Sequence, residues 1–176
     1  MFKLQGFTLI ELLVVLAIVA IMMAIGVPSY RFIANTSRVA SEVNALVGDM
    51  QFARSEAIKR GMSVSLCAAA SSACTGATSW NSGWIVFTDT NGNGALDTGD
   101  AIVRIQPAFS ADQFTASNSV SAISFNREGY ISGLVADPVT IKLQPANTTS
   151  TNWTRCVAIS MLGRFRIQTI GQGNCS

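Results

Sequence analysis

The chain opens with a long apolar stretch that one acidic residue interrupts. From Leu9 to Val27, 19 residues contain no charged side chain except that of Glu11. At about 1.5 Å per residue, a helix of this length spans roughly 28 Å, which is close to the hydrocarbon thickness of a bilayer. The stretch can therefore hold the protein in a membrane. Gly26 and Pro28 close it, and we expect Pro28 to kink or loosen the helix.

From Tyr30 onward the pattern becomes amphipathic. Apolar residues recur at steps of three and four, which is the spacing of one helical face. They are Val39, Val43, Leu46, Val47, Met50, Ala53, Ala57 and Ile58. The charged residues Arg38, Glu42, Asp49, Arg54 and Lys59 are expected mostly on other faces. Gly61 is typical of a helix end, so one helix of about 80 Å is predicted from Phe7 to Arg60, with its second half packed on a domain.

After Gly61, short apolar runs alternate with Gly, Asn, Asp and Ser, which is typical of strands and turns. The predicted strands are Ser63–Ala68, Gly83–Thr88, Ala101–Ile105, Ala122–Asn126, Tyr130–Ser132, Val139–Leu143, Cys156–Met161 and Phe165–Thr169. The segments 69–79 and 144–153 are predicted to be loops. The sequence thus predicts an α+β chain, a long helix followed by a β domain.

A six-residue leader precedes the apolar stretch. An ordinary secretory signal has its cleavage site after the apolar region, whereas here the candidate site, Gly6-Phe7, lies before it. The charged leader, Gly6, Phe7, Glu11 and the apolar run resemble the class III leader of type IV pilins and type II secretion pseudopilins. The resemblance implies cleavage after Gly6 by a prepilin peptidase and methylation of the new N-terminal residue. It also implies that Glu11, which is costly inside a membrane, meets the N-terminal amine of a neighbouring subunit.

Composition excludes several classes of function. Charged residues make up 12% of the chain, the net charge is +2, and histidine is absent. The missing histidine removes Ser-His-Asp and Cys-His catalysis and His-containing zinc sites. The sequence holds no glycine-rich phosphate loop and no cofactor fingerprint, so we expect neither enzymatic activity nor a cofactor.

Four cysteines, Cys67, Cys74, Cys156 and Cys175, allow three pairings. Disulfides persist in exported domains, and the pairs closest in sequence, Cys67–Cys74 and Cys156–Cys175, give the simplest pattern. A metal site is disfavoured because the chain has no CxxC pair.

The segment from Asp89 to Asp100 admits two interpretations. Its oxygen-bearing residues nearly fit the calcium loop of an EF-hand, with Asp100 in place of the final Glu. They are Asp89, Asn91, Asn93, Asp97 and Asp100. However, the shorter Asp makes bidentate closure harder, and no flanking helices are predicted. Asn, Asp and Gly also favour hairpin turns, which is the preferred interpretation, and no metal site is assigned.

Motifs along the rest of the chain resemble the GspH/FimT group of minor pilins and pseudopilins. They include residues 52–60, 83–94, 124–129, 156–160 and Gly163-Arg164. The family fold implied is a long N-terminal helix packed against a small antiparallel β-sandwich or pair of sheets. We therefore expect a leader at 1–6, a transmembrane or filament-core helix at 7–28, an amphipathic helix at 29–61, and a globular β domain at 62–176.

The C-terminal end is basic. No acidic residue follows Asp137, whereas Lys142, Arg155, Arg164 and Arg166 all do. On a strand, Arg164 and Arg166 would lie on one face about 7 Å apart, and their guanidiniums could each clamp a phosphate. Phe165 and Ile167 would then turn inward.

The sequence Gly163-Arg164-Phe165-Arg166 resembles the GRxR motif through which FimT-type pilins contact DNA. The resemblance implies DNA contacts at Gly163, Arg164 and Arg166, and we expect Arg155 and Lys142 to extend the patch. An ordinary solvated strand face is the alternative.

These features together predict a FimT-like minor pilin. We expect it to sit in the inner membrane before assembly, with its C-terminal domain periplasmic, and in a surface pilus afterwards. It would contact other pilin subunits through the N-terminal helix and bind double-stranded DNA non-specifically for natural transformation. The alternative is a structural minor pilin of FimU type or a GspH pseudopilin, which would prime filament assembly without binding DNA.

Overall fold

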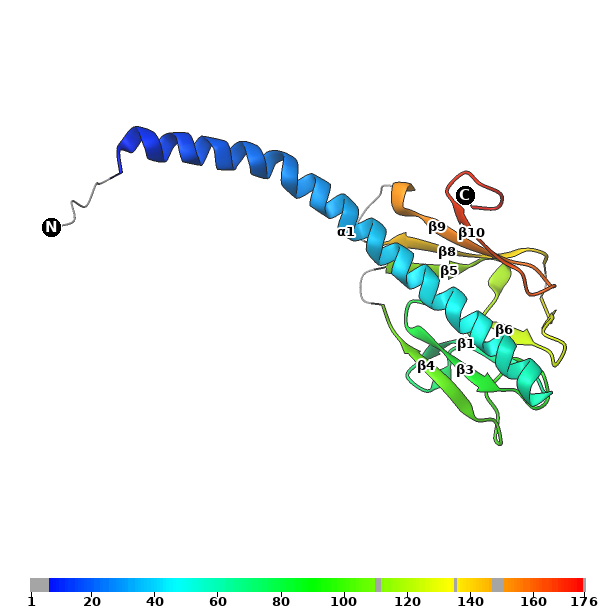
Figure 1. The fold of residues 1–176 in the computed structure, drawn as a ribbon. Helices are drawn as coiled ribbons and strands as arrows, with labels where there is room; N and C mark the ends of the chain where they lie inside the picture. The colour runs from blue at the N-terminus through cyan, green and yellow to red at the C-terminus, as the bar shows by residue number, and fades with distance from the viewer. Residues whose placement is uncertain (1–6, 110–111, 135, 147–150, 176) are drawn as a thin grey trace. The chain divides into compact units, whose positions relative to one another are not determined.

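A computed structural model describes residues 7–109, 112–134, 136–146 and 151–175. One helix, α1 (Leu9–Arg60), is followed by ten strands in the described ranges (Figure 1). The chain divides into two compact units, one up to Ser37 and the other from Arg38 onward. The leader, including the predicted cleavage residue Gly6, lies outside the described residues.

In the first unit, α1 begins two residues later than predicted because Thr8 caps it. The Thr8 N–H and hydroxyl donate to Glu11 Oε2 at 3.1 and 3.0 Å, and the Glu11 N–H donates to Thr8 Oγ1 at 3.3 Å. This reciprocal pattern is a capping box. The helix continues through Pro28, and its first part is long and apolar enough to cross a membrane. All its side chains from Leu9 to Ile33 are exposed within this chain.

The second unit contains two antiparallel sheets. The first has the order β4-β3-β1-β6-β7, with β2 beside β1, and the second has the order β10-β9-β8-β5. The strands of the first sheet are β1 (Val64–Ala70), β2 (Ala73–Cys74), β3 (Gly83–Thr88), β4 (Ile102–Pro107), β6 (Ala122–Phe125) and β7 (Ile131–Ser132). Those of the second are β5 (Asp112–Ala116), β8 (Val139–Pro145), β9 (Arg155–Ile159) and β10 (Phe165–Thr169). Eight of the ten were predicted within two residues at each end, whereas β2 and β5 were missed.

The core of this unit is shared by α1 and both sheets. One continuous cluster joins Leu46 and Met50 of α1 to Leu66 and Trp84 of the first sheet and Ile141 of the second. The amphipathic face of the helix is therefore what brings the two sheets into one core. In that cluster Trp84, Phe109 and Phe114 have ring centroids 5.5–5.7 Å apart, spacings at which aromatic pairs attract.

Glu42 and Asp49 of α1 are buried, contrary to the prediction that they lie on other faces. Glu42 and Asp49 are 6% and 5% exposed. Asp49 accepts hydrogen bonds from Trp84 Nε1 at 2.8 Å and from Arg104 Nη1 at 2.6 Å. Because both sheets pack against the helix, more of its circumference is covered than one apolar stripe would indicate. Ile58 was predicted on the buried stripe but is 53% exposed.

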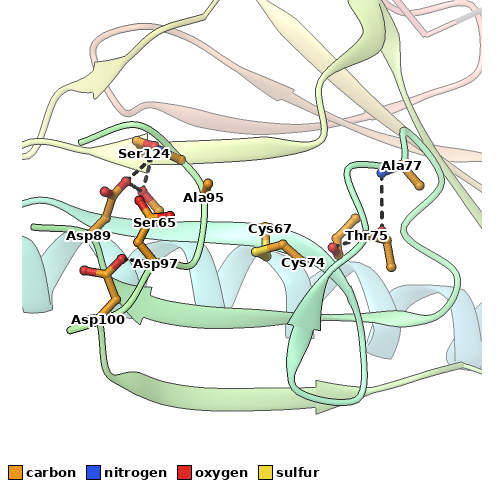
Figure 2. The surroundings of a disulfide bond; sticks show 12 residues. Ser65, Cys67, Cys74, Thr75, Ala77, Asp89, Ala95, Asp97, Asp100 and Ser124 are labelled. Carbon is orange, nitrogen blue, oxygen red and sulfur yellow. Dashed lines mark hydrogen bonds between the residues drawn. A yellow bond between two sulfur atoms is a disulfide. The ribbon is translucent and has the colours of Figure 1, made fainter. Parts of the chain in front are cut away.

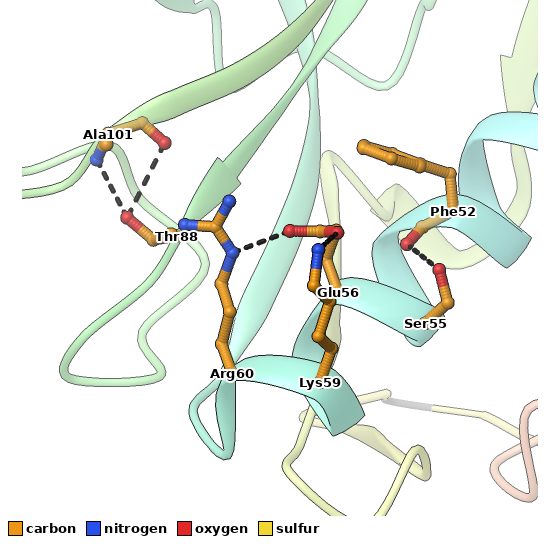
Figure 3. A network of polar contacts seen from close by, with 7 residues as sticks. All are labelled: Phe52, Ser55, Glu56, Lys59, Arg60, Thr88 and Ala101. Atoms are coloured by element: carbon orange, nitrogen blue, oxygen red, sulfur yellow. Dashed lines mark hydrogen bonds and ion pairs between the residues drawn. The ribbon is translucent and has the colours of Figure 1, made fainter.

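The last turn of α1 is held by a local charge cluster (Figure 3). Arg60 Nε lies 2.6 Å from Glu56 Oε2, and Lys59 Nζ lies 3.5 Å from Glu56 Oε1. The two cations also suit the negative end of the helix dipole. Gly61 follows with φ +65° and donates its N–H to Ala57 O, which ends the helix.

Candidate functional site

The predicted basic site lies on the hairpin formed by β9 and β10. Arg166 pairs with Ala158, and Gln168 pairs with Cys156. The turn between the strands is closed by Ser160 N–H donating to Arg164 O at 3.1 Å and Gly163 N–H donating to Ser160 O at 2.9 Å. Arg164 therefore ends the turn, and β10, which carries Arg166, begins at the next residue.

Gly163 shapes this turn and is buried, whereas the motif had implied a direct DNA contact at this residue. Its φ is +70°, and a Cβ there would lie 2.8 Å from Gly129 O and 3.1 Å from Arg54 Cζ. Arg54 Nη1 also donates to Gly163 O at 2.9 Å. Only glycine satisfies both the positive φ and the close approach. The glycine of the motif is thus a structural requirement of the turn.

Arg164 and Arg166 are both exposed and lie on the same side of β10. They line a groove of about 370 Å³ together with Ser160, Gln168 and Asp137. On the opposite side of the strand, Phe165 packs against the core cluster, as predicted, with its ring centroid 6.2 Å from that of Phe125. Ile167 shares that side but is 47% exposed, so it turns inward less than predicted.

The two guanidiniums differ from the other arginines of the second unit in having no partner among the residues that the structure describes. Six arginines are engaged: Arg38 with Asp112, Arg54 with Gly163 O, Arg60 with Glu56, Arg104 with Asp49, Arg127 with Glu128, and Arg155 with Thr154 O. Within the described ranges, neither the Arg164 nor the Arg166 guanidinium makes a hydrogen bond or an ion pair. Their donors are therefore available for a ligand.

One acidic residue belongs to the groove and was missed by sequence reasoning. Asp137 is exposed, lines the groove beside Arg164 and Arg166, and accepts a hydrogen bond from Met161 N–H at 3.3 Å. The linear sequence placed Asp137 before the basic segment. In the fold, the residues before β8 meet the turn after β9, so the groove carries two positive charges and one negative charge.

The two residues predicted to extend the patch lie on different faces of the sheet. In an antiparallel ladder, directly paired residues share a face. Lys142 pairs with Cys156, which pairs with Gln168, so Lys142 shares the face of Arg166. Two strand spacings and one two-residue step separate Lys142 from Arg166, which amounts to about 12 Å.

Arg155 lies on the opposite face, because it pairs with Leu143 and Thr169 at alternate positions of the ladder. Its guanidinium donates to Thr154 O at 2.9 Å. The expectation that Arg155 extends the patch is therefore wrong. Strand alternation settles this point once the register is known, whereas nearness in sequence does not.

The C-terminal tail is fixed next to this site. Cys156 and Cys175 form a disulfide, as do Cys67 and Cys74, which confirms the pairing that the sequence favoured. Cys175 is buried. The Cys175 N–H donates to Gln172 O, and the Gly171 N–H donates to Cys175 O. The tail thus closes as a compact loop on the face that bears Lys142 and Gln168.

The loop from Asp89 to Asp100 is organised by hydrogen bonds to its own carboxylates. Asp89 is fully buried and accepts from the N–H groups of Gly92, Asn93 and Gly94 at 2.8–3.1 Å. Figure 2 shows Ser65 lying between Asp89 and Ser124, with contacts of 2.6 and 2.7 Å. These contacts fix one end of the loop against β1 and β6.

The other end of the loop is closed by Asp100. Hydrogen bonds from the backbone N–H groups of Thr90 and Asp97 lower the pKa of Asp100. Within the described ranges, no group of three or more His, Cys, Asp or Glu side chains is arranged to hold a metal ion. The carboxylate oxygens of Asp89 and Asp100, which the calcium interpretation assigned to the ion, thus accept hydrogen bonds from N–H groups of the loop itself.

Sequence comparison gives two matches. The family described as Type II transport protein GspH matches residues 42–163, and the prokaryotic N-terminal methylation motif matches residues 1–27. The second match covers Gly6, Phe7 and Glu11. The first covers most of the second unit and ends at the turn before Arg164.

Solved structures share the fold. The type IV minor pilin FimU of Pseudomonas aeruginosa is 22% identical in one crystal form, with a TM-score of 0.55 over 79% of this chain and 92% of that chain. The minor pseudopilin EpsH from the Type 2 Secretion System of Vibrio cholerae is 12% identical, with a TM-score of 0.52 over 76% of this chain and 98% of that chain. At these identities the likeness concerns the fold: a long N-terminal helix and two antiparallel sheets.

Proposed function

The chain belongs to the GspH family, and we propose that this member is a minor type IV pilin that binds extracellular double-stranded DNA for uptake. Its methylation motif and exposed apolar helix fit a pilin anchored in the inner membrane before it joins a surface pilus. Prepilin peptidase would cleave between Gly6 and Phe7. Glu11, which caps its own helix in the single chain, would meet the N-terminal amine of a neighbouring subunit on assembly.

The observation that carries the DNA proposal is the pair of unengaged guanidiniums on one exposed strand face. Arg164 and Arg166 project about 7 Å apart from a strand whose turn is fixed by Gly163 and Arg54. A rigid support limits the conformational entropy lost on binding. Each guanidinium can form forked hydrogen bonds with a phosphate. The other arginines of the second unit are engaged within the protein.

Phosphate contacts position a protein on DNA but carry no base information. We therefore expect binding without sequence preference. With two contacts, the slope of log K against log salt concentration is about −2, and it approaches −3 if Lys142 reaches a third phosphate. The affinity of one subunit would be modest, and several subunits on a filament would add avidity.

The test is retardation of a fluorescent duplex by the full chain in detergent micelles, at low and physiological salt. We expect Arg164→Gln/Arg166→Gln to weaken binding at least tenfold and to flatten the salt dependence. The matched control is Lys59→Gln/Arg127→Gln, which removes the same charge from two side chains that are 76% and 72% exposed elsewhere. Equal binding by wild type and the first variant, or equal loss in both variants, would contradict the proposal.

A second candidate is favoured by the description of the matching family as a type II transport protein and by the fold shared with EpsH. It is a structural minor pilin or a pseudopilin that primes filament assembly without binding DNA. The same retardation experiment separates the two, because this candidate predicts no binding at either salt concentration. Pilus or secretion genes beside its own would then distinguish a pilin from a pseudopilin.

A further inference from the structure

A second groove lies on the other side of β10, between that strand and α1. Its volume is about 610 Å³. Val47, Gln51 and Arg54 line it from successive turns of one helix face, and Phe165 and Ile167 line it from the strand. All these residues belong to the second unit, and the DNA proposal assigns none of them a DNA contact, although Arg54 holds the turn and Arg164 lines both grooves.

The groove follows a free strand edge. β10 is the terminal strand of its sheet and, among the described strands, pairs with β9 alone. Ser160 N–H donates to Arg164 O, so the hydrogen-bonded pairs of the ladder are those of Arg164, Arg166 and Gln168. The N–H and C=O groups of Phe165 and Ile167 consequently point away from β9, toward the open edge.

This edge is open over a short, defined length. Thr169 N–H donates to Gln172 Oε1 at 3.2 Å, and Gln172 N–H donates to Thr169 O at 3.0 Å, so the C-terminal tail covers the end of the strand. At the other end, Arg54 occupies Gly163 O. Between them, the backbone groups of Phe165 and Ile167 make no hydrogen bond to the described residues. A bare edge of this kind is a template for another strand.

The residues that line the groove favour a ligand with apolar side chains along its middle and an acidic side chain at one end. Ile167 is 47% exposed, and Val47 and Phe165 are half-buried, so the middle of the groove is apolar. Arg54 and Arg164 supply its charges at the Gly163 end, and the described lining contains no acidic residue. Arg54 uses one of its five N–H donors on Gly163 O.

We propose that the open edge of β10 pairs with an extended segment of a protein partner, adding a strand to the sheet. In that segment, apolar residues alternate with polar ones and face the groove, and an acidic residue follows them beside Arg54. The segment runs antiparallel to β10, so the acidic residue lies toward its C-terminal end. Backbone hydrogen bonds would supply affinity and the groove would supply specificity.

The charges of the groove argue against two other occupants. A second copy of this chain paired antiparallel through the same edge, with Phe165 opposite Ile167, would place Arg166 of each copy opposite the other, and like charges across a strand pair are destabilising. Duplex DNA would leave the apolar middle of the groove and the open backbone donors unmatched. An acidic, strand-forming segment satisfies both features.

The test uses the full chain in detergent micelles and blocked peptides of sequence Thr-Val-Thr-Val-Thr-Glu-Thr and Thr-Val-Thr-Val-Thr-Lys-Thr. Amide hydrogen exchange is followed at Phe165 and Ile167, whose N–H groups point to the open edge. We expect the glutamate peptide to slow exchange at both amides at least tenfold at saturation. The lysine peptide should bind at least tenfold more weakly.

Four variants locate the interaction. Ile167→Pro removes an N–H that the β9 ladder does not use, so it should abolish peptide binding while the strand pairing is kept; Ile167→Thr keeps the N–H and should retain binding. Arg54→Gln should remove the preference for glutamate over lysine. Arg166→Gln, on the other face, should leave peptide affinity unchanged, which separates this inference from DNA binding.

Unchanged exchange at Phe165 and Ile167 with the glutamate peptide would overturn the inference. So would equal protection by both peptides, or protection of these amides by duplex DNA in place of the peptide.

Discussion

Glu42 is an acid buried where α1 meets β5, and its surroundings change its titration. The pKa of Glu42 is raised to about 8, mainly by burial and then by the hydrogen bond and the negative charge of Asp112, while the positive charge of Arg38 acts in the opposite direction. Arg38 is itself bound to Asp112 at 2.8 Å, and Glu42 Oε2 has no partner among the described residues. The folded protein therefore keeps a proton on Glu42 that the unfolded chain releases near pH 4.5.

Stability should consequently fall as pH rises from about 4.5 to about 8, because in that range the folded state binds more protons than the unfolded state. Glu42→Gln mimics the protonated form. We expect it to remove this pH dependence and to raise the free energy of unfolding at pH 8 by about 1–2 kcal/mol. Urea unfolding followed by tryptophan fluorescence measures this free energy of unfolding.

The exposed Glu128→Gln serves as the matched control and should leave the pH dependence in place. A wild-type stability that is constant or rising between pH 5 and 8 would show that Glu42 ionises normally in the folded protein.

Asp137 provides a second prediction at the residue scale. Its negative charge lines the same groove as Arg164 and Arg166, and it would repel a phosphate. Asp137→Asn removes the charge and keeps an oxygen that can accept the Met161 N–H. We expect this variant to bind duplex DNA about two- to fivefold more tightly at low salt, with the gain shrinking at high salt because ions screen the charge.

The control for Asp137→Asn is Asp97→Asn, which neutralises an exposed carboxylate on the loop before β4. If both variants bind equally tightly, the gain reflects net charge and not the position of Asp137. If Asp137→Asn binds more weakly, DNA does not approach this groove.

At the scale of elements, the β9–β10 hairpin acts as a frame for two arginines. Its turn is tied to α1 through Arg54 and Gly163, and its far end is tied to the tail through Gln172 and the Cys156–Cys175 disulfide. The strand between these two anchors carries unengaged cations on one face and the open backbone edge that borders the second groove. A short, fixed strand thus presents two surfaces of different chemistry.

The two disulfides should contribute unequally to stability. They are separated by 19 residues for Cys156–Cys175 and by 7 for Cys67–Cys74. In the loop-entropy description, the longer loop stabilises by about 3 kcal/mol and the shorter by about 2.5 kcal/mol. We expect Cys156→Ala/Cys175→Ala to lower the free energy of unfolding by more than Cys67→Ala/Cys74→Ala does, as measured in urea.

Cys156→Ala/Cys175→Ala should also loosen the C-terminal tail. The Thr169 amide should exchange faster in this variant, whereas Cys67→Ala/Cys74→Ala should leave the exchange of that amide unchanged. Equal exchange at Thr169 in both would indicate that the tail is held by its hydrogen bonds alone.

At the scale of the whole molecule, the net charge does not indicate where unpaired positive charges lie on the surface. The chain carries +2 overall, which gives little long-range attraction for DNA. In the described part of the second unit, however, most of the arginines pair with carboxylates or donate to carbonyl oxygens, and Arg164 and Arg166 do neither. A binding surface therefore arises from how the fold distributes its ion pairs, not from an excess of basic residues.

Much of the architecture was predictable from local patterns. Leu9 to Val27 could only be a membrane-length apolar helix, and the steps of three and four after Val39 required a continued helix. Strand Gly83–Thr88 was predicted with its observed bounds because an unbroken apolar run lies between turn residues. Strand β5 (Asp112–Ala116) was missed because its Asp-Gln-Phe-Thr-Ala sequence holds only one large apolar side chain. Pairing with β8 makes it a strand.

The sequence by itself determined the leader, the long helix, the β character of the rest and the residue types at the candidate site, because periodicity, turn residues and short motifs act over a few positions. Only the tertiary structure decided that Arg155 faces away from Arg166, that Asp137 joins the groove, that Gly163 is buried under Arg54, and that Glu42 and Asp49 lie inside. Each of these features depends on strand register or on packing between segments far apart in the chain. No local sequence pattern encodes which distant segments pack together.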